Sequence, residues 1–248
     1  MALCDLHYFS NALGKQTAAT VLLPETGTGP FAVLYLLHGL SDDHTIWLRR
    51  TSVERYVGSL PLIVVMPDGG RGFYSDAKEG YVYDTALAVE LVDRIDGTFP
   101  TRAAREGRCV AGLSMGGYGA VKFAAGHPDR FCAAVSHSGA LGWGHQETQR
   151  DGSPLSAEWQ RILGPDFVGG PNDLYALCEK LTPDRRPALR IDCGTEDFLI
   201  DDNRRFHEFL ESKNIPHEYA EHPGAHNWDY WDIHIQETLA FFQRVMAL

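Results

Sequence analysis

A serine flanked by glycines is the first candidate for chemistry in this chain. Residues 112–116 read Gly-Leu-Ser-Met-Gly, which has the form Gly-x-Ser-x-Gly with Ser114 at its centre. The segment directly follows the apolar run 109–111 and directly precedes a helical pattern. In a sharp turn from strand to helix a serine hydroxyl is exposed, and the two glycines let neighbouring backbone approach closely. The motif therefore predicts that Ser114 is a nucleophile.

The partners that would activate this serine follow it in the chain. A serine hydroxyl is a weak nucleophile unless a histidine accepts its proton and a carboxylate orients that histidine. Asp197 comes just after the strand-like segment 188–193, and His226 lies in a loop after the extended segment 217–221. Serine, acid and histidine in this order are typical of α/β-hydrolases. We therefore predict a catalytic triad of Ser114, Asp197 and His226.

His222 is the main alternative to His226 as the base, but it would sit within the extended segment and not in the loop beyond it. Other histidines precede the candidate acid and fit the chain order badly: His38, His44, His127 and His137. His222 and His226 are four residues apart, a spacing that zinc ligands show on a helix. Pro223 and Gly224 interrupt any helix there, so no metal site is expected.

Several carboxylates compete with Asp197 for the place of the acid: Glu196, Asp192, Asp201 and Asp202. The pair at 201 and 202 precedes a helical pattern and is expected to cap it. Asp192 falls inside the strand-like segment, where it would point to one face of the sheet. Asp197 is preferred because it follows that strand and lies at the same sheet edge as Ser114.

Two backbone N–H groups are needed to bind the oxyanion of a tetrahedral intermediate. Met115, directly after the nucleophile, is expected to supply the first. The second usually comes from a loop after an early strand. Residues 38–41 (His-Gly-Leu-Ser) directly follow the apolar run 33–37, so we expect the Leu40 amide there. No glycine-rich phosphate-binding motif occurs, and no cofactor is expected.

The elements that must position these residues alternate between strand and helix. Continuous apolar runs predict strands buried on both faces at 31–37, 62–66, 108–112, 131–136 and 188–193, after a first β-rich segment at 17–23. Apolar residues at a period near 3.6 predict helices at 83–99, 115–125, 203–212 and 232–246. This alternation predicts an α/β fold, a mostly parallel twisted sheet with helices on both faces.

The whole chain, residues 1–248, is expected to form a single domain, because α/β folds often reach about 250 residues as one unit. The stretch 139–187 interrupts the alternation with glycine, proline, tryptophan and scattered polar residues. It shows only short helical patterns, near Ser156 and Asp173. We interpret it as a short cap insertion over the strand ends, where α/β sheets bind ligands.

Composition restricts the partners. The chain has 22 basic and 33 acidic residues, a formal net charge of −11, which repels nucleic acids and anionic membranes. No apolar run is long enough to span a membrane, and residues 1–10 lack the pattern of a signal peptide, so a cytoplasmic protein is expected. Five cysteines without a paired spacing favour buried free thiols over disulfides. Whether the chain forms a homo-oligomer stays open.

The sequence resembles the esterase D family, most closely its tributyrin esterase branch. Related groups are the S-formylglutathione hydrolases, the feruloyl esterases and the antigen 85 mycolyltransferases. The resemblance covers roughly residue 33 to the C-terminus and is carried by five segments in order: His38-Gly39-Leu40, Pro67-Asp68-Gly69, Gly112–Gly117, Gly194-Thr195-Glu196-Asp197 and His226-Asn227-Trp228. It implies an α/β-hydrolase fold, an ester substrate, the same triad, and Leu40 and Met115 as oxyanion donors.

The substrate is expected to be a small ester with a short acyl chain. S-formylglutathione hydrolases carry Thr-Cys after His-Gly-Leu and Ser-Tyr-Tyr-Phe after the histidine, whereas this chain has Ser41-Asp42 and Asn227-Trp228. These differences make a glutathione thioester a less favoured substrate than a small ester. Feruloyl esters and acetylated carbohydrates remain candidate substrates. Tryptophans that could line an apolar pocket are Trp228, Trp231, Trp143 and Trp47.

Two further classes of function remain alternatives. An acyltransferase, which passes the acyl group to an alcohol in place of water, would use the same residues as a hydrolase. A non-catalytic binding protein with this fold would usually have lost part of the triad, and here every part is present.

Overall fold

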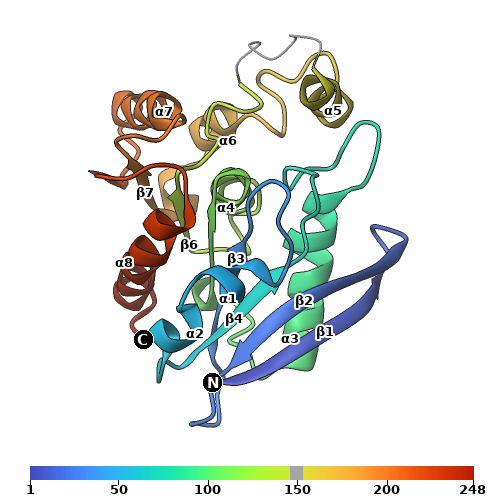
Figure 1. The fold of residues 1–248 in the computed structure, drawn as a ribbon, viewed down its shortest axis with the longest axis vertical. Helices are drawn as coiled ribbons and strands as arrows, with labels where there is room; N and C mark the ends of the chain where they lie inside the picture. Colours follow the sequence, from blue (N-terminus) through green and yellow to red (C-terminus); the bar gives the residue numbers. More distant parts are fainter. Residues whose placement is uncertain (146–152) are drawn as a thin grey trace.

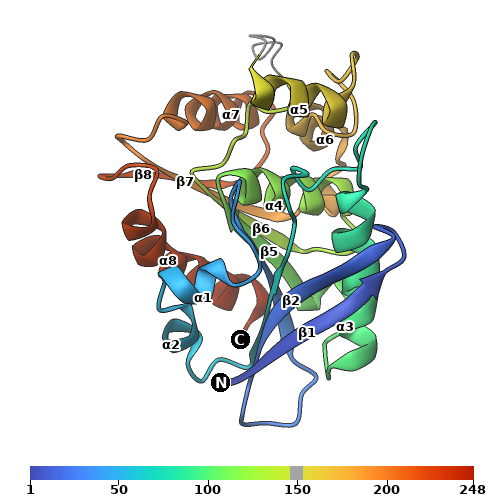
Figure 2. The same cartoon turned by 45° about the vertical axis from the view of Figure 1, so that its right-hand side comes forward.

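The computed structural model describes residues 1–145 and 153–248, and its strands form one mixed sheet (Figures 1 and 2). In the described residues the strand order is β1-β2-β4-β3-β5-β6-β7-β8. Strands β3 to β8 run parallel, whereas β2 is antiparallel to both of its neighbours. Their bounds are β1 Ala2–Ser10, β2 Lys15–Leu23, β3 Ala32–Leu37, β4 Leu62–Pro67, β5 Arg108–Leu113, β6 Ala133–His137, β7 Ala188–Gly194 and β8 Glu218–His222.

The central strands are buried on both faces, as their continuous apolar runs predict. Every residue of β3, β4, β5 and β6 is buried. Because successive side chains of a strand point to opposite faces, Val33, Tyr35 and Leu37 of β3 join one hydrophobic cluster. Ala32, Leu34 and Leu36 join a second cluster on the other face. The sheet therefore separates two cores, each of which needs a layer of helices.

Helices supply both layers. The cluster around Leu34 is covered by α1 Ile46–Arg50, α2 Val53–Val57 and α8 Trp228–Met246. The opposite cluster is covered by the π-helical turn η1 Thr85–Leu91, α3 Val92–Thr98, α4 Met115–Gly126, α5 Pro154–Leu163, α6 Leu174–Lys180 and α7 Ile200–Ser212. Two short 3₁₀ turns complete the described elements, η2 Arg105–Gly107 and η3 Pro183–Arg185.

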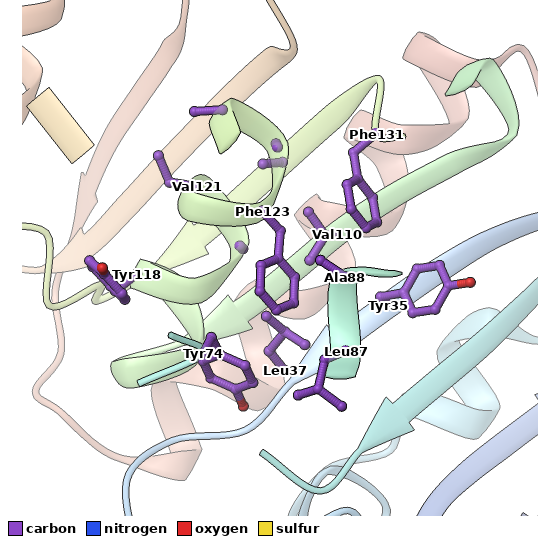
Figure 3. Close-up of a cluster of buried hydrophobic side chains, with 14 of the residues drawn as sticks. Tyr35, Leu37, Tyr74, Leu87, Ala88, Val110, Tyr118, Val121, Phe123 and Phe131 are labelled. Carbon is purple, nitrogen blue, oxygen red and sulfur yellow. The ribbon is translucent and has the colours of Figure 1, made fainter. Parts of the chain in front are cut away.

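Helix α4, which begins directly after Ser114, is deeply buried next to the nucleophile. All of its residues from Met115 to Ala125 are buried. Phe123 stacks on Phe131 with ring centroids 6.2 Å apart and meets the edge of Tyr74 (Figure 3). The ammonium group of Lys122 is also buried, and it pairs with the Asp84 carboxylate. This packing fixes α4 against the sheet and with it the position of Ser114, the predicted nucleophile.

The segment 139–187 runs between β6 and β7. Its described residues contain α5 and α6, whose N-termini are capped by Ser153 and Asp173. Residues 146–152 of this stretch lie outside the described part of the chain. Both views show α5, α6 and α7 together at one end of the molecule (Figures 1 and 2).

The expected fold class is confirmed, and the differences are local. The strand expected at 131–136 is shifted to Ala133–His137, and the helix expected at 83–99 begins as the π-helical turn η1. Strand β1 is not among the predicted strands. It is an edge strand whose exposed face mixes Asp5 and His7 with Leu3 and Phe9, so it lacks the continuous apolar run that marks the buried strands. Within residues 1–145 and 153–248, no helix has the length and apolar character that crossing a membrane requires.

Candidate active site

Ser114 occupies the strained turn between β5 and α4. Its backbone has φ 53° and ψ −117°, a conformation that few non-glycine residues adopt. The turn is held by its neighbours, since the Ser114 N–H donates to the His137 carbonyl at 2.9 Å. A Cβ on Gly116 would lie 2.5 Å from the Leu37 carbonyl oxygen, so a side chain there would push α4 away from β3. The flanking glycines thus permit the close approach that presents the serine at the strand end.

The candidate acid and base come from two adjacent loops. Asp197 follows β7, and His226 follows β8. The imidazole Nδ1 of His226 lies 2.8 Å from Oδ2 of Asp197. The Leu199 N–H donates to the other carboxylate oxygen at 2.8 Å. Backbone bonds join the two loops, among them Glu196 N–H to the Gly224 carbonyl at 2.9 Å, so the acid and the base are positioned together.

The Asp197 carboxyl is fully buried, which by itself would oppose ionisation. Burial is outweighed by hydrogen bonds from His226, the Leu199 N–H and the Ser138 hydroxyl, which hold the pKa of Asp197 below its ordinary value. The carboxylate is therefore charged at neutral pH and accepts a hydrogen bond from Nδ1–H of His226. This arrangement leaves the other ring nitrogen, Nε2, with a lone pair available as a base.

One cleft of about 430 Å³ brings the predicted nucleophile and base together. Its lining comes from the segments that follow β3, β5, β7 and β8, together with the end of β5 and the first turn of α8. The lining residues are Gly39, Leu40, Asp42, Leu113, Ser114, Phe198, His226, Asn227, Trp228 and Trp231. The acid Asp197 lies behind His226 and does not line the cleft.

The loop after β3, in which Leu40 lines this cleft, is held in place by hydrogen bonds. His38 is buried, which lowers its pKa and keeps the ring neutral. Its Nδ1 lies 2.7 Å from the Gly39 carbonyl, and its Nε2 accepts the Gly69 N–H at 2.8 Å. Tyr74 donates its hydroxyl to the His38 carbonyl at 2.9 Å. Within the described part of the chain the Leu40 N–H meets no acceptor, which leaves it free for a ligand.

The tryptophans divide between the cleft and the core. Trp228 and Trp231 line the cleft, and Trp231 meets the His226 ring edge-on at 4.9 Å. Trp47 is buried behind Trp228 and contacts it at 5.4 Å without reaching the cleft. Trp143 lies elsewhere, stacked on Phe73 in the core at 4.3 Å. Its place in the core reflects the ordinary packing preference of a large apolar ring.

His222, the alternative to His226 as the base, makes its contacts in another part of the structure. His222 ends β8 and stacks on His234 at 4.2 Å, close to Glu237. Donor atoms of these three residues lie within 4.8 Å of one another. The two rings are nearly parallel, so their nitrogen lone pairs do not converge, and Glu237 is already paired with Arg190.

The rival carboxylates are likewise occupied elsewhere. Asp192 lies in the core, where it accepts from His137 at 2.8 Å and from Tyr230. Asp201 and Asp202 do not cap α7 as expected. They lie in its first turn, after Leu199 at the cap position.

Two residues of the cleft were not anticipated from the sequence, Phe198 and Asp42. Phe198 directly follows the acid, and its ring is 76% exposed while it packs on His226 at 4.5 Å. An apolar residue next to a catalytic acid in a loop is the signal that could have found it. Asp42 follows the oxyanion-loop motif by one residue, and its carboxylate turns back toward Gly39.

Asp42 and its neighbour Asp43 have opposite electrostatic environments. Burial, together with repulsion from Asp43, raises the pKa of Asp42 despite attraction from Arg50 and Arg49. Hydrogen bonds from the Thr45 hydroxyl and N–H, at 2.6 and 2.8 Å, lower the pKa of Asp43. Only the first of the two carboxylates lines the cleft.

The fold is the α/β-hydrolase fold, and its structural neighbours place the chain among the serine hydrolases. FphF, a fluorophosphonate-binding serine hydrolase of Staphylococcus aureus, matches with a TM-score of 0.86 and 33% identity over 97% of this chain and 98% of that one. An S-formylglutathione hydrolase of the same organism matches with a TM-score of 0.85 and 34% identity over the same shares. An acetyl esterase of Caldicellulosiruptor saccharolyticus is 27% identical over 99% of both chains.

The Esterase family model, described as "Putative esterase", matches residues 10–242. The chain belongs to this family of carboxylic ester hydrolases.

Replacing Asp42 by asparagine is expected to stabilise the fold at neutral pH. Because the folded-state pKa of Asp42 is raised, this group favours folding only below its unfolded pKa, and that contribution is lost as the pH rises through the folded-state value. Asp42→Asn should therefore raise the melting temperature at pH 7, and the gain should vanish near pH 3, measured by circular dichroism. Asp43→Asn should have the opposite sign at pH 7, since the pKa of Asp43 is lowered. A lower melting temperature for Asp42→Asn at pH 7 would contradict this prediction.

Proposed function

We propose that this ester hydrolase is a serine carboxylesterase for short-chain acyl esters, with Ser114, His226 and Asp197 as its triad. The observation that carries the proposal is the 2.8 Å pair of His226 Nδ1 and Asp197, placed in one cleft with a serine on a strained strand-to-helix turn. A buried, ionised carboxylate behind a histidine and a serine beside it form the set that nucleophilic acyl transfer requires.

The reaction proceeds in two acyl-transfer steps. The Ser114 hydroxyl attacks the ester carbonyl while Nε2 of His226 accepts its proton, and the imidazolium returns that proton to the departing alcohol. Water then attacks the acyl-enzyme by the same route and releases the carboxylic acid and the free serine. Asp197 holds the Nδ1–H tautomer of His226 and stabilises the imidazolium.

The oxyanion is bound by backbone amides of Leu40 and Met115. Met115 is the first residue of α4, so its N–H has no partner within the helix and lies at the positive end of the helix dipole. Leu40 lines the cleft on a loop held by His38 and Tyr74, which supports its N–H as the second donor. Preorganised donors of this kind contribute roughly 3–4 kcal/mol each to the stabilisation of a transition state.

A small ester fits the cleft and agrees with the acetyl esterase relative, which aligns over nearly the whole chain. A cleft of about 430 Å³ between Phe198, Trp228 and Trp231 accepts a short acyl chain but offers no long apolar tunnel. The similarity to the S. aureus S-formylglutathione hydrolase makes a glutathione thioester the second candidate. An acyltransferase would use the same residues, and added acceptor alcohol would reveal it through a transesterified product.

Removal of the nucleophile gives the first test. Ser114→Ala should lower kcat for p-nitrophenyl acetate by about 10⁶ while leaving the circular dichroism spectrum unchanged, because no other group can form the acyl-enzyme. A fluorophosphonate probe should label the wild type on Ser114 and should not label the variant. Retention of more than a tenth of wild-type activity would refute the assignment.

The two neighbouring histidines give a matched comparison. His226→Ala should cost nearly as much in kcat as Ser114→Ala, because the triad acts as a unit, and Asp197→Asn should cost about 10⁴. His222→Ala and Glu196→Gln are the controls, since His222 lies four residues before the base, Glu196 directly precedes the acid, and neither lines the cleft. Each should retain activity within about tenfold. An inactive but well-folded His222 variant would reassign the base.

Acyl length tests the substrate class. For p-nitrophenyl esters, kcat/KM should hold or rise from acetyl to butyryl and then fall, because each methylene is worth roughly 1–3 kcal/mol only while the pocket has room for it. Feruloyl esters, acetylated sugars and S-formylglutathione complete the panel. A maximum at C12 or longer would contradict the proposal. Turnover of S-formylglutathione a hundredfold faster than p-nitrophenyl acetate would promote the second candidate.

A further inference from the structure

The triad and the oxyanion hole leave one charged residue of the cleft without an assignment. Asp42 lines the same cleft as Ser114 and His226. Its Oδ2 lies 3.3 Å from the position that a Cβ on Gly39 would take, and the Ser114 Cβ lies 3.7 Å from that same position. The carboxylate oxygen and the Ser114 Cβ are therefore no farther apart than these two distances combined. The Asp42 carboxyl thus lies near Ser114, where the ester carbonyl must bind.

This charge is poorly compensated. Among the ion pairs of the described residues, none within 4.0 Å includes Asp42, although many other surface carboxylates are paired. Arg49 and Arg50 attract it, but both are exposed to solvent, where their charges are screened. A backbone interaction with Gly39 favours the charged form of the carboxyl and offsets only part of its burial. Asp43, in contrast, turns its carboxylate away to Thr45.

We propose that Asp42 sets the charge selectivity of the cleft, so that esters with an uncharged acyl and alcohol part are accepted and esters carrying a carboxylate near the reacting carbonyl are rejected. The proposal rests on the proposed esterase function and narrows its substrate class. A substrate carboxylate in the cleft would lie within several ångströms of Asp42, in a partly desolvated space where like charges repel strongly. Glutathione bears carboxylates, so the same repulsion disfavours its thioesters.

Two pairs of substrates that differ mainly in charge test this directly. On the alcohol side, 4-acetoxybenzoate is compared with its methyl ester. On the acyl side, the p-nitrophenyl monoester of glutaric acid is compared with p-nitrophenyl valerate. For each pair the quantity measured is the ratio of kcat/KM for the anionic to the neutral ester, so that a general loss of activity cancels. Asp42→Asn should raise this ratio about tenfold for at least one pair.

The control is Asp43→Asn. This substitution removes an equal charge at the neighbouring residue, whose carboxylate does not line the cleft. It should change neither ratio by more than about twofold. Added salt should weaken the discrimination by the wild type and leave that of Asp42→Asn unchanged.

Ratios that stay within twofold for both pairs in Asp42→Asn, or an equal rise in Asp43→Asn, would overturn the proposal. If the neutral esters are turned over but the ratios do not move, only the charge selectivity fails. If the wild type does not hydrolyse the neutral esters, or Ser114→Ala still does, the esterase proposal fails instead.

Discussion

The close approach of α4 to strands β3 and β5 is the constraint on which the site depends. A positive φ at Ser114 can persist only because the packing on both sides determines it: the turn is bonded to β6, and α4 is buried along its length. Gly116 lies against the Leu37 carbonyl, at the end of the strand from which the oxyanion loop departs. The same contact therefore sets the distance between the nucleophile and the Leu40 amide.

The sequence was most informative where local chemistry and burial agree. The buried strands and the turn at Ser114 were predictable because a continuous apolar run, or a serine between spaced glycines, is compatible with few local structures. Edge strand β1 and the short helices α1 and α2 were not, because their residues face both solvent and protein and leave no clean period. The local sequence pattern thus predicts strands that are buried on both faces better than it predicts elements that lie between the core and solvent.

The spacing of residues in the sequence could not predict which side chains of the site point into the cleft. Trp143 and Trp47 are the same residue type as Trp228, yet Trp47 is buried behind Trp228 and Trp143 stacks on Phe73 in the core, away from the cleft. Asp42 and Asp43 are adjacent, but only the three-dimensional course of the loop decides that one faces the cleft and the other bonds to Thr45. Phe198 was hidden for the same reason, since exposure of a large apolar ring depends on the loop around it.

The connection between β6 and β7 has a consequence for how such a protein can diverge. The proposed nucleophile follows β5, the proposed acid follows β7 and the proposed base follows β8, whereas the excursion that holds α5 and α6 carries none of the three. Parts of it contact the site, because the Ala140 N–H donates to the Ser114 carbonyl at 3.1 Å and the Tyr118 hydroxyl of α4 donates to the Asn172 carbonyl at 2.7 Å. Away from these contacts its length and composition can change without moving a reacting atom. Insertions and deletions in the rest of the excursion can therefore alter this end of the molecule while the three candidate residues keep their places.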